Sequence, residues 1–190
     1  MIQDRPSVNQ PDLCTVLDLA GDKVKSSMNC VSIGTIQTFY PANQTADVAL
    51  NYKIWQGNSP STPVVSYPLL VNCPVVILNG GGSYITFPIK EGDSCLVLFC
   101  DREMDTWFTN GGTNAPQSAR VHDLNDGIAL VGIYNSLNSL SNYYTDGIYL
   151  VSPYIKSSNS FGVGNGATGT FTSDDGKLIT VVEGIIVSIQ

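Results

Sequence analysis

Charged side chains are scarce in this chain. Only 13% of its 190 residues are Asp, Glu, Lys or Arg, about half the share found in ordinary soluble domains. The nine basic residues are scattered rather than clustered, and the formal net charge is −7. Proteins that hold nucleic acid use a basic patch or stripe, so we expect no nucleic acid among the partners. A surface this poor in charge is typical of chains that cover part of it in an oligomer.

Metal-binding, secretory and membrane patterns are also missing. The five cysteines form no CxxC pair and His122 is the only histidine, so we expect no metal and no cofactor. An odd number of cysteines within apolar runs indicates reduced, buried thiols in a protein made in a cytosol. The first 30 residues predict no signal peptide, and the longest apolar run, residues 69–78, is too short to span a bilayer.

One helix is expected near the N-terminus. Between residues 11 and 28, apolar side chains recur at three- and four-residue steps, at Leu13, Val16, Leu17, Ala20 and Val24. This spacing predicts an amphipathic helix, weakened by a glycine at position 21 and by a leucine at position 19 that falls off the apolar face.

From residue 31 onward the pattern becomes strand-like, because apolar runs alternate with Pro, Asn and Gly. A Ser/Pro-rich loop is expected at residues 57–63, turns at 79–82 and 91–93, and a polar loop at 101–126. We expect strands at residues 31–40, 46–54, 71–78, 84–89, 95–100 and 127–133. Together with the single helix, this order predicts a mainly β protein built on a small Greek-key barrel of the OB type.

The predicted strand at residues 95–100 (CLVLFC) is apolar at every position. Successive side chains of a strand point to opposite faces, so both faces of this strand need a cover. One face can fill the barrel. The other is left for the N-terminal helix or for a neighbouring chain.

The composition changes after residue 134, where Ser, Asn, Gly and Tyr dominate and charges nearly disappear. Turns at 175–176 and 183–184 divide residues 169–189 into a meander of three very short strands, which cannot build a core alone. Winding three copies into one intertwined shaft would bury their apolar side chains. We therefore expect an N-terminal helical segment at 1–29, a barrel at 30–133 and a trimeric shaft at 134–190. The predicted trimer-interface residues are Ile148, Leu150, Ile179, Val181, Ile185, Val187 and Ile189.

No motif predicts catalysis. His122 and Asp123 could form a base with its orienting carboxylate, but in a polar loop such a pair is far more often a structural hydrogen-bonding pair. Residues 123–127 (Asp-x-Asn-x-Gly) hint at calcium, yet the later acidic ligand of an EF-hand is missing, and a turn held by Asx side chains is favoured. The Gly162-x-Gly164-x-Gly166 series lacks the lysine of a phosphate loop and indicates turns.

Aromatic side chains offer a weaker hint of binding. Trp55 and Trp107 could stack on sugars or bases, but anchoring in the barrel or in an interface is the favoured interpretation. No Gly-x-Ser-x-Gly elbow occurs, and nothing places two carboxylates in one cleft. We expect that the protein is not an enzyme.

Two blocks of the sequence carry a resemblance to a known family. They are YITFPIKEGDSCLVLFCDREMDTWF (residues 84–108) and HDLNDGIALVGI (residues 122–133), and the similarity extends to the turn at 80–82 and to the C-terminal block 169–189. This pattern, which covers well over half of the chain, resembles the central-spike (baseplate assembly V-type) proteins of contractile phage tails. The resemblance implies an N-terminal OB barrel followed by a trimeric β-helical needle.

The resemblance also implies a function. It is that of a structural virion protein, made in the host cytoplasm, which forms the homotrimeric central spike of a contractile tail baseplate. The implied partners are a baseplate hub protein, the host outer envelope that the spike helps to penetrate during genome delivery, and a separate spike-tip protein. One departure bears on the tip: the family often carries a His-x-His pair there for an iron ion, and His122 is the only histidine in this chain.

Two other classes of function remain open at this point. An OB-fold glycan-binding module of a tail or injection particle would use the same barrel, with Trp55 or Trp107 against the sugar. A wall-degrading enzyme is the third, since some spikes carry a fused lysozyme domain, but this chain leaves no room for one.

Overall fold

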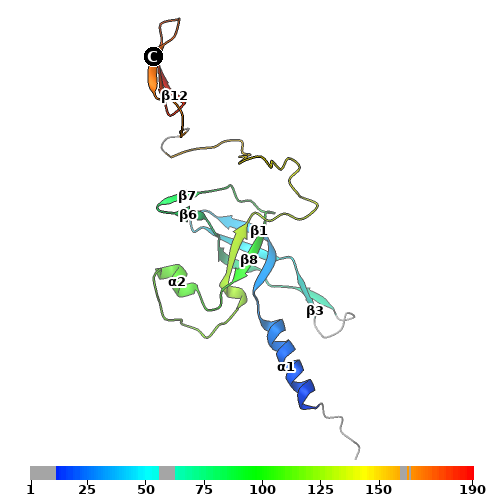
Figure 1. Cartoon of the computed structure of the whole chain (residues 1–190). Coiled ribbons are helices and arrows are strands. Elements are labelled where there is room, and N and C mark those ends of the chain that lie inside the picture. The colour runs from blue at the N-terminus through cyan, green and yellow to red at the C-terminus, as the bar shows by residue number, and fades with distance from the viewer. Residues whose placement is uncertain (1–11, 56–62, 159–161, 163) are drawn as a thin grey trace, which may run out of the picture. The chain divides into compact units, whose positions relative to one another are not determined.

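The computed structural model describes residues 12–55, 63–158, 162 and 164–190 (Figure 1). Most of the predicted loop at 57–63, the first residue of the predicted helix and the residue between Gly162 and Gly164 lie outside these ranges, as does the Trp55 side chain. The chain divides into two compact units, Met1–Leu140 and Ser141–Gln190, which are described separately.

The predicted N-terminal helix is confirmed as α1 (Leu13–Ser27). It begins where the Asp12 side chain accepts a hydrogen bond of 2.7 Å from the backbone N–H of Thr15, an N-cap that satisfies one of the free donors of the first turn. No residue of α1 is buried, and its apolar face lies open to solvent. Neither this helix nor any other in the described part of the chain is long and apolar enough to cross a membrane.

A curled, five-stranded antiparallel sheet forms the body of the first unit. Its strands run in the order β5 (Leu70–Pro74), β2 (Thr45–Leu50), β1 (Val31–Tyr40), β8 (Ser94–Phe99) and β9 (Gly127–Val131). The two edges approach each other just beyond β5, where Val75 and Ala129 form a parallel bridge and the Val76 N–H donates to the Ala129 carbonyl at 2.9 Å. The sheet is therefore a half-barrel whose concave side is nearly closed.

The core lies on the concave side of this sheet. The predicted inner face of residues 95–100 is confirmed, because Cys95, Val97 and Phe99 are buried while Leu96 and Leu98 are not. Gly34 sits directly opposite Cys95, and a Cβ at that position would lie 2.5 Å from Cγ1 of Val48. The other buried hydrophobic members of the core cluster are Ile36, Ala46, Val48, Leu50, Leu70, Cys73, Val75 and Ala129.

Two hairpins extend from the half-barrel. The predicted glycine turn is confirmed between β6 (Leu78–Gly80) and β7 (Ser83–Ile85), where Gly81 and Gly82 adopt φ values of +58° and +81° that suit a tight hairpin. The strand predicted at 71–78 is in fact divided between β5 and β6. The second hairpin pairs β3 (Lys53–Trp55) with β4 (Val64–Ser66) on either side of the predicted Ser/Pro loop. The strand predicted at 46–54 is divided between β2 and β3, and β4 was not predicted.

The predicted polar loop at 101–126 is more ordered than its composition indicated. It contains a short helix, α2 (Asp105–Asn110), and a single 3-10 turn, η1 (Leu124–Asp126). A helix of six residues is too short to produce a periodic apolar pattern, so the sequence analysis missed it.

The second unit contains the predicted meander of three short strands. These are β10 (Gly169–Thr172), β11 (Leu178–Val182) and β12 (Ile185–Ile189), paired antiparallel in that order. The turn after β11 is held by preceding residues, since the Glu183 N–H donates to Thr168 Oγ1 at 3.0 Å and the Gly184 N–H to the Ala167 carbonyl at 2.9 Å. Among the described residues of this unit, none is buried.

Cysteine reactivity should follow the burial of the core. Cys14 and Cys30 are exposed, whereas burial raises the pKa of the Cys73 and Cys95 thiols from the usual 9.0 to about 11. Their thiolate fraction at pH 8 then falls about 100-fold. With a chromogenic disulfide reagent, we expect the two exposed thiols to react first, Cys100 more slowly, and the two core thiols only after unfolding. Rapid reaction of all five cysteines in the native protein would contradict this core.

Candidate functional site

The sheet of the second unit has one strongly apolar face. Residues that stand directly opposite each other on paired strands share a face, and the register places Phe171 opposite Ile179 and Ile179 opposite Ile189. Two residues further along β11, Val181 stands opposite Ile186. We call these five residues, Phe171, Ile179, Val181, Ile186 and Ile189, the shaft apolar face.

The opposite face of the same sheet is largely polar. Thr170, Thr180 and Ser188 stand side by side on the three strands, because Thr180 pairs with both of the others. Apolar residues occupy this face only at its two ends, where Leu178 pairs with Thr172 and Val182 with Ile185. The sheet is therefore amphipathic, although its strands are at most five residues long.

The structure brings some of the predicted interface residues together and separates others. Ile179, Val181 and Ile189 lie on the shaft apolar face, whereas Ile185 lies on the opposite face next to Val182. Val187 is the extra residue of a bulge and has no partner on β11. Phe171 and Ile186, which the sequence analysis did not select, join this face because of that register.

The remaining two predicted residues lie outside the sheet. Ile148 and Leu150 belong to a segment without regular strands, and their side chains are 93% and 61% exposed. Nothing in the described part of the second unit covers them.

The shaft apolar face lacks a second layer. A single three-stranded sheet needs a partner for its apolar side, yet Phe171, Ile186 and Ile189 are each more than half exposed. Burial of one fully exposed side chain of this kind is worth about 1.5–3 kcal/mol; because these five are already partly buried, covering the face would stabilise each chain by roughly 5 kcal/mol. The shaft apolar face is therefore a surface that another chain can cover.

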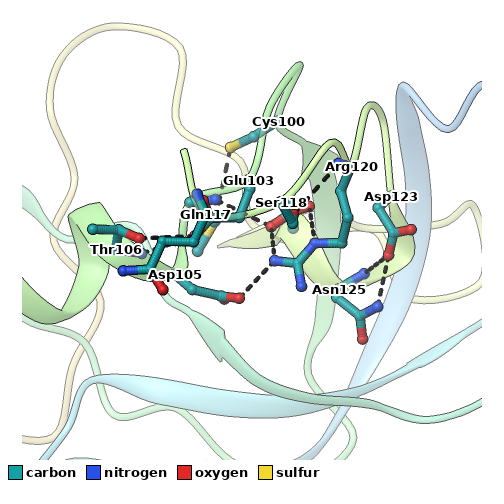
Figure 2. Close-up of polar contacts among 11 residues, drawn as sticks. Cys100, Glu103, Asp105, Thr106, Gln117, Ser118, Arg120, Asp123 and Asn125 are labelled. Atoms are coloured by element: carbon teal, nitrogen blue, oxygen red, sulfur yellow. Dashed lines mark hydrogen bonds and ion pairs between the residues drawn. The ribbon is translucent and has the colours of Figure 1, made fainter. Parts of the chain in front are cut away.

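In the first unit, hydrogen bonds and ion pairs among polar side chains, Glu103, Asp105 and Arg120 among them, hold the loop at 101–126 (Figure 2). Asp126 is fully buried, and Arg120 donates to both of its carboxylate oxygens, from Nε at 3.1 Å and from Nη2 at 2.8 Å. The Met104 N–H adds a third bond of 3.1 Å, and Arg120 Nη2 also contacts Asp105 at 2.6 Å. The hydrogen bonds to Asp126 and then Asp105 raise the pKa of Arg120, so the guanidinium stays charged.

Glu103 ties the two halves of the same loop together. Its carboxylate accepts hydrogen bonds from the backbone N–H of Gln117 at 2.9 Å and of Thr106 at 3.0 Å. These bonds, the one from Gln117 first, lower the pKa of Glu103. The loop is therefore fixed by ionised side chains, and its polar composition serves local structure.

His122 and Asp123 do not form a base and its orienting carboxylate. His122 Nδ1 lies 3.1 Å from the Asn29 carbonyl, and the His122 carbonyl accepts from Asn29 Nδ2 at 2.8 Å. Asp123 instead accepts from the Asn125 backbone and side chain, at 2.9 and 2.6 Å, as in an Asx turn. The predicted Asx turn is confirmed, but the favoured hydrogen-bonding pair of His122 with Asp123 is wrong, because His122 Nε2 lies 3.6 Å from an Asp101 carboxylate oxygen instead.

A shallow cleft of about 460 Å³ lies beside His122. Asn29 and Leu70 line it together with the His122–Asn125 segment. Among the described residues, no group of three or more His, Cys, Asp or Glu is placed to hold a metal ion there or elsewhere. Trp107 lies on α2 and is 55% exposed, so it does not anchor the barrel. Of the two favoured roles, anchoring in the barrel or in an interface, the first is excluded.

The first unit is a half-barrel with its own core, and the sheet of the second unit leaves one apolar face uncovered. The sequence model of one family, described as Phage protein Gp138 N-terminal domain, matches residues 33–132, which is more than half of the chain. The chain belongs to this family; it is a phage structural protein of the tail or baseplate type and hence a virion component. The family that matches is not the V-type central-spike family that the sequence motifs resemble. No curated protein matches the chain.

Proposed function

We propose that this protein is the homotrimeric central spike of a contractile tail baseplate. In this proposal the half-barrel is an OB barrel that docks under a baseplate hub protein. The C-terminal regions of three copies wind into a short β-helical shaft, which points at the host envelope and helps to penetrate it during genome delivery. A separate tip protein would complete the shaft, and the chain itself would catalyse no reaction.

The observation that carries this proposal is the shaft apolar face. The second unit holds 50 residues, yet none of those described is buried and its sheet presents five large apolar side chains on one side. Three such faces turned toward a common axis would form the core that one chain lacks. An intertwined shaft also suits a mechanical role, since no single chain can peel away alone.

The strand order supports the barrel assignment. In an OB fold the first strand pairs with both the second and the fourth, and the third and fifth strands close the barrel side by side. Here β1 pairs with β2 and β8, and the parallel bridge between Val75 and Ala129 joins the two edges.

The first experiment is the native mass of the purified full-length chain. We expect light scattering behind a sizing column to give three times the 20.3 kDa of one chain, and the trimer to survive SDS at room temperature. Intertwined chains can separate only by unfolding, which makes such a trimer slow to dissociate. A clean monomer would contradict the spike and favour the second candidate below.

The exposed Trp107 favours one other function, a glycan-binding module of a tail or injection particle. Phe108, its neighbour on α2, is also exposed, at 44%, and aromatic faces of this kind stack on sugar rings. Saturable quenching of Trp107 fluorescence by host surface glycans, lost in Trp107→Ala, would support this alternative.

A further inference from the structure

A second uncovered apolar surface lies on the convex side of the half-barrel. The strand register places Val31 opposite Leu98 and Leu98 opposite Ile128, and a second row joins Ile33, Leu96 and Leu130 in the same way. Their neighbours in each strand point inward to the core, so these six side chains point outward. We call these six residues, Val31, Ile33, Leu96, Leu98, Ile128 and Leu130, the outer patch.

The outer patch is only partly covered within one chain. Val31 is 56% exposed and Leu98 37%, whereas the other four residues are mostly buried. The apolar pattern of β8 predicted a cover on this side, either the N-terminal helix or a neighbouring chain. Since no residue of α1 is buried, the helix of the same chain does not do so.

The connection between α1 and β1 explains why α1 does not cover the outer patch of its own chain. Only residues 28–30 separate them, and Asn29 is clamped by its two hydrogen bonds to His122. The Cys30 carbonyl then accepts from the Phe99 N–H at 3.0 Å, which commits the chain to the sheet. Reversing α1 onto its own outer patch would require a sharp turn at Met28, the one residue between the helix and these fixed positions.

The chain therefore carries two apolar surfaces of complementary shape that do not meet: a helix ridge and a sheet face. We propose that α1 of one copy docks on the outer patch of the next copy around the trimer, an inference that rests on the proposed trimeric spike. The ridge consists of Leu13, Val16, Leu17, Ala20 and Val24, and each copy gives one helix and receives one. In a ring of three, every ridge and every patch is covered.

The dimensions agree with this exchange. A 15-residue helix is about 22 Å long, and three adjacent strands present a face about 10 Å across, on which one helix fits. One such contact buries on the order of 1,000 Å², the lower limit for a specific interface, so it would act together with the shaft. A bundle of three α1 helices is less favourable, because it has only two heptads, contains Gly21, and would leave the outer patch bare.

Disulfide trapping between two different full-length chains tests the exchange. Both chains carry Cys14→Ser, Cys30→Ser and Cys100→Ser; one is tagged and has Leu17→Cys, and the other is untagged and has Leu98→Cys. After co-expression and mild oxidation, we expect a two-chain band containing both versions. The matched control replaces Leu17→Cys with Asp22→Cys on the opposite side of α1, and should give roughly tenfold less of this band.

The other outcomes overturn the exchange. A disulfide between the Leu17→Cys positions of two tagged chains would mean a helix bundle. An internal disulfide in a single chain that carries both Leu17→Cys and Leu98→Cys would mean that α1 folds back on its own chain. A two-chain band no stronger than that of the Asp22→Cys control would also contradict the exchange. Light scattering on the same samples separates the two proposals. A trimer without the expected cross-link would refute the exchange alone, whereas a monomer would refute the spike as well.

Discussion

Val181→Asp is expected to abolish the trimer. Val181 lies in β11, the central strand of the shaft sheet, opposite Gly169 on one side and Ile186 on the other. In the proposed shaft, three carboxylates would be buried near one axis without cationic partners, which costs several kcal/mol for each. The native mass should fall from three chains to one, and resistance to SDS should be lost.

Thr180→Asp is the matched control for this change. Thr180 is the adjacent residue of the same strand, but it lies on the opposite face between Thr170 and Ser188. The same charge at this position should leave the trimer intact. A Val181→Asp protein that still assembles normally would contradict the shaft apolar face as the trimer interface.

Arg120→Ala should strongly destabilise the first unit. It removes the only side chain seen to donate to Asp126 in the described structure and leaves a fully buried carboxylate with one backbone N–H, from Met104. Removing one partner of a buried ion pair costs about 3–5 kcal/mol, and since Arg120 is itself partly exposed we expect about 3 kcal/mol. In a Trp55→Phe background, urea unfolding followed by Trp107 fluorescence reports on the loop that this pair holds.

Asp105→Asn provides the comparison. Asp105 also bonds to Arg120, at 2.6 Å, but its side chain is 63% exposed. An exposed ion pair contributes less than about 1 kcal/mol, so the unfolding midpoint should change little. Equal effects of Arg120→Ala and Asp105→Asn would mean that Asp126 is not the centre of the cluster.

The two proposals assign different tasks to the two units. The half-barrel has a complete core on its concave side, so it can fold within one chain and present α1 and the outer patch to its neighbours. The shaft sheet has no described core, so in the proposed trimer its stability would come from association. The low charge of the chain agrees with both the spike and the helix exchange, because the surfaces that one copy exposes to solvent are apolar.

Much of the fold could be predicted from short-range patterns. The spacing of Leu13, Leu17 and Val24 predicted α1, the glycines at 81–82 predicted the β6–β7 turn, and alternation predicted that one face of β8 fills the barrel, without saying which. The sequence also showed that the C-terminal strands are too short to form a core alone. Each of these signals comes from residues near one another in the chain, where helix period, strand period and turn chemistry act directly.

What the sequence could not decide depends on contacts between distant residues. The bulge at Val187 sets which side chains join the shaft apolar face, and it placed Ile185 on the other side. The pairing of Arg120 with Asp126, and the outer patch built from β1, β8 and β9, arise only when the sheet curls and brings these segments together. By itself the sequence determined the helix, the order of the strands and the turns between them. The tertiary structure decided which apolar side chains share an uncovered face, because register and burial are properties of paired strands and not of any one segment.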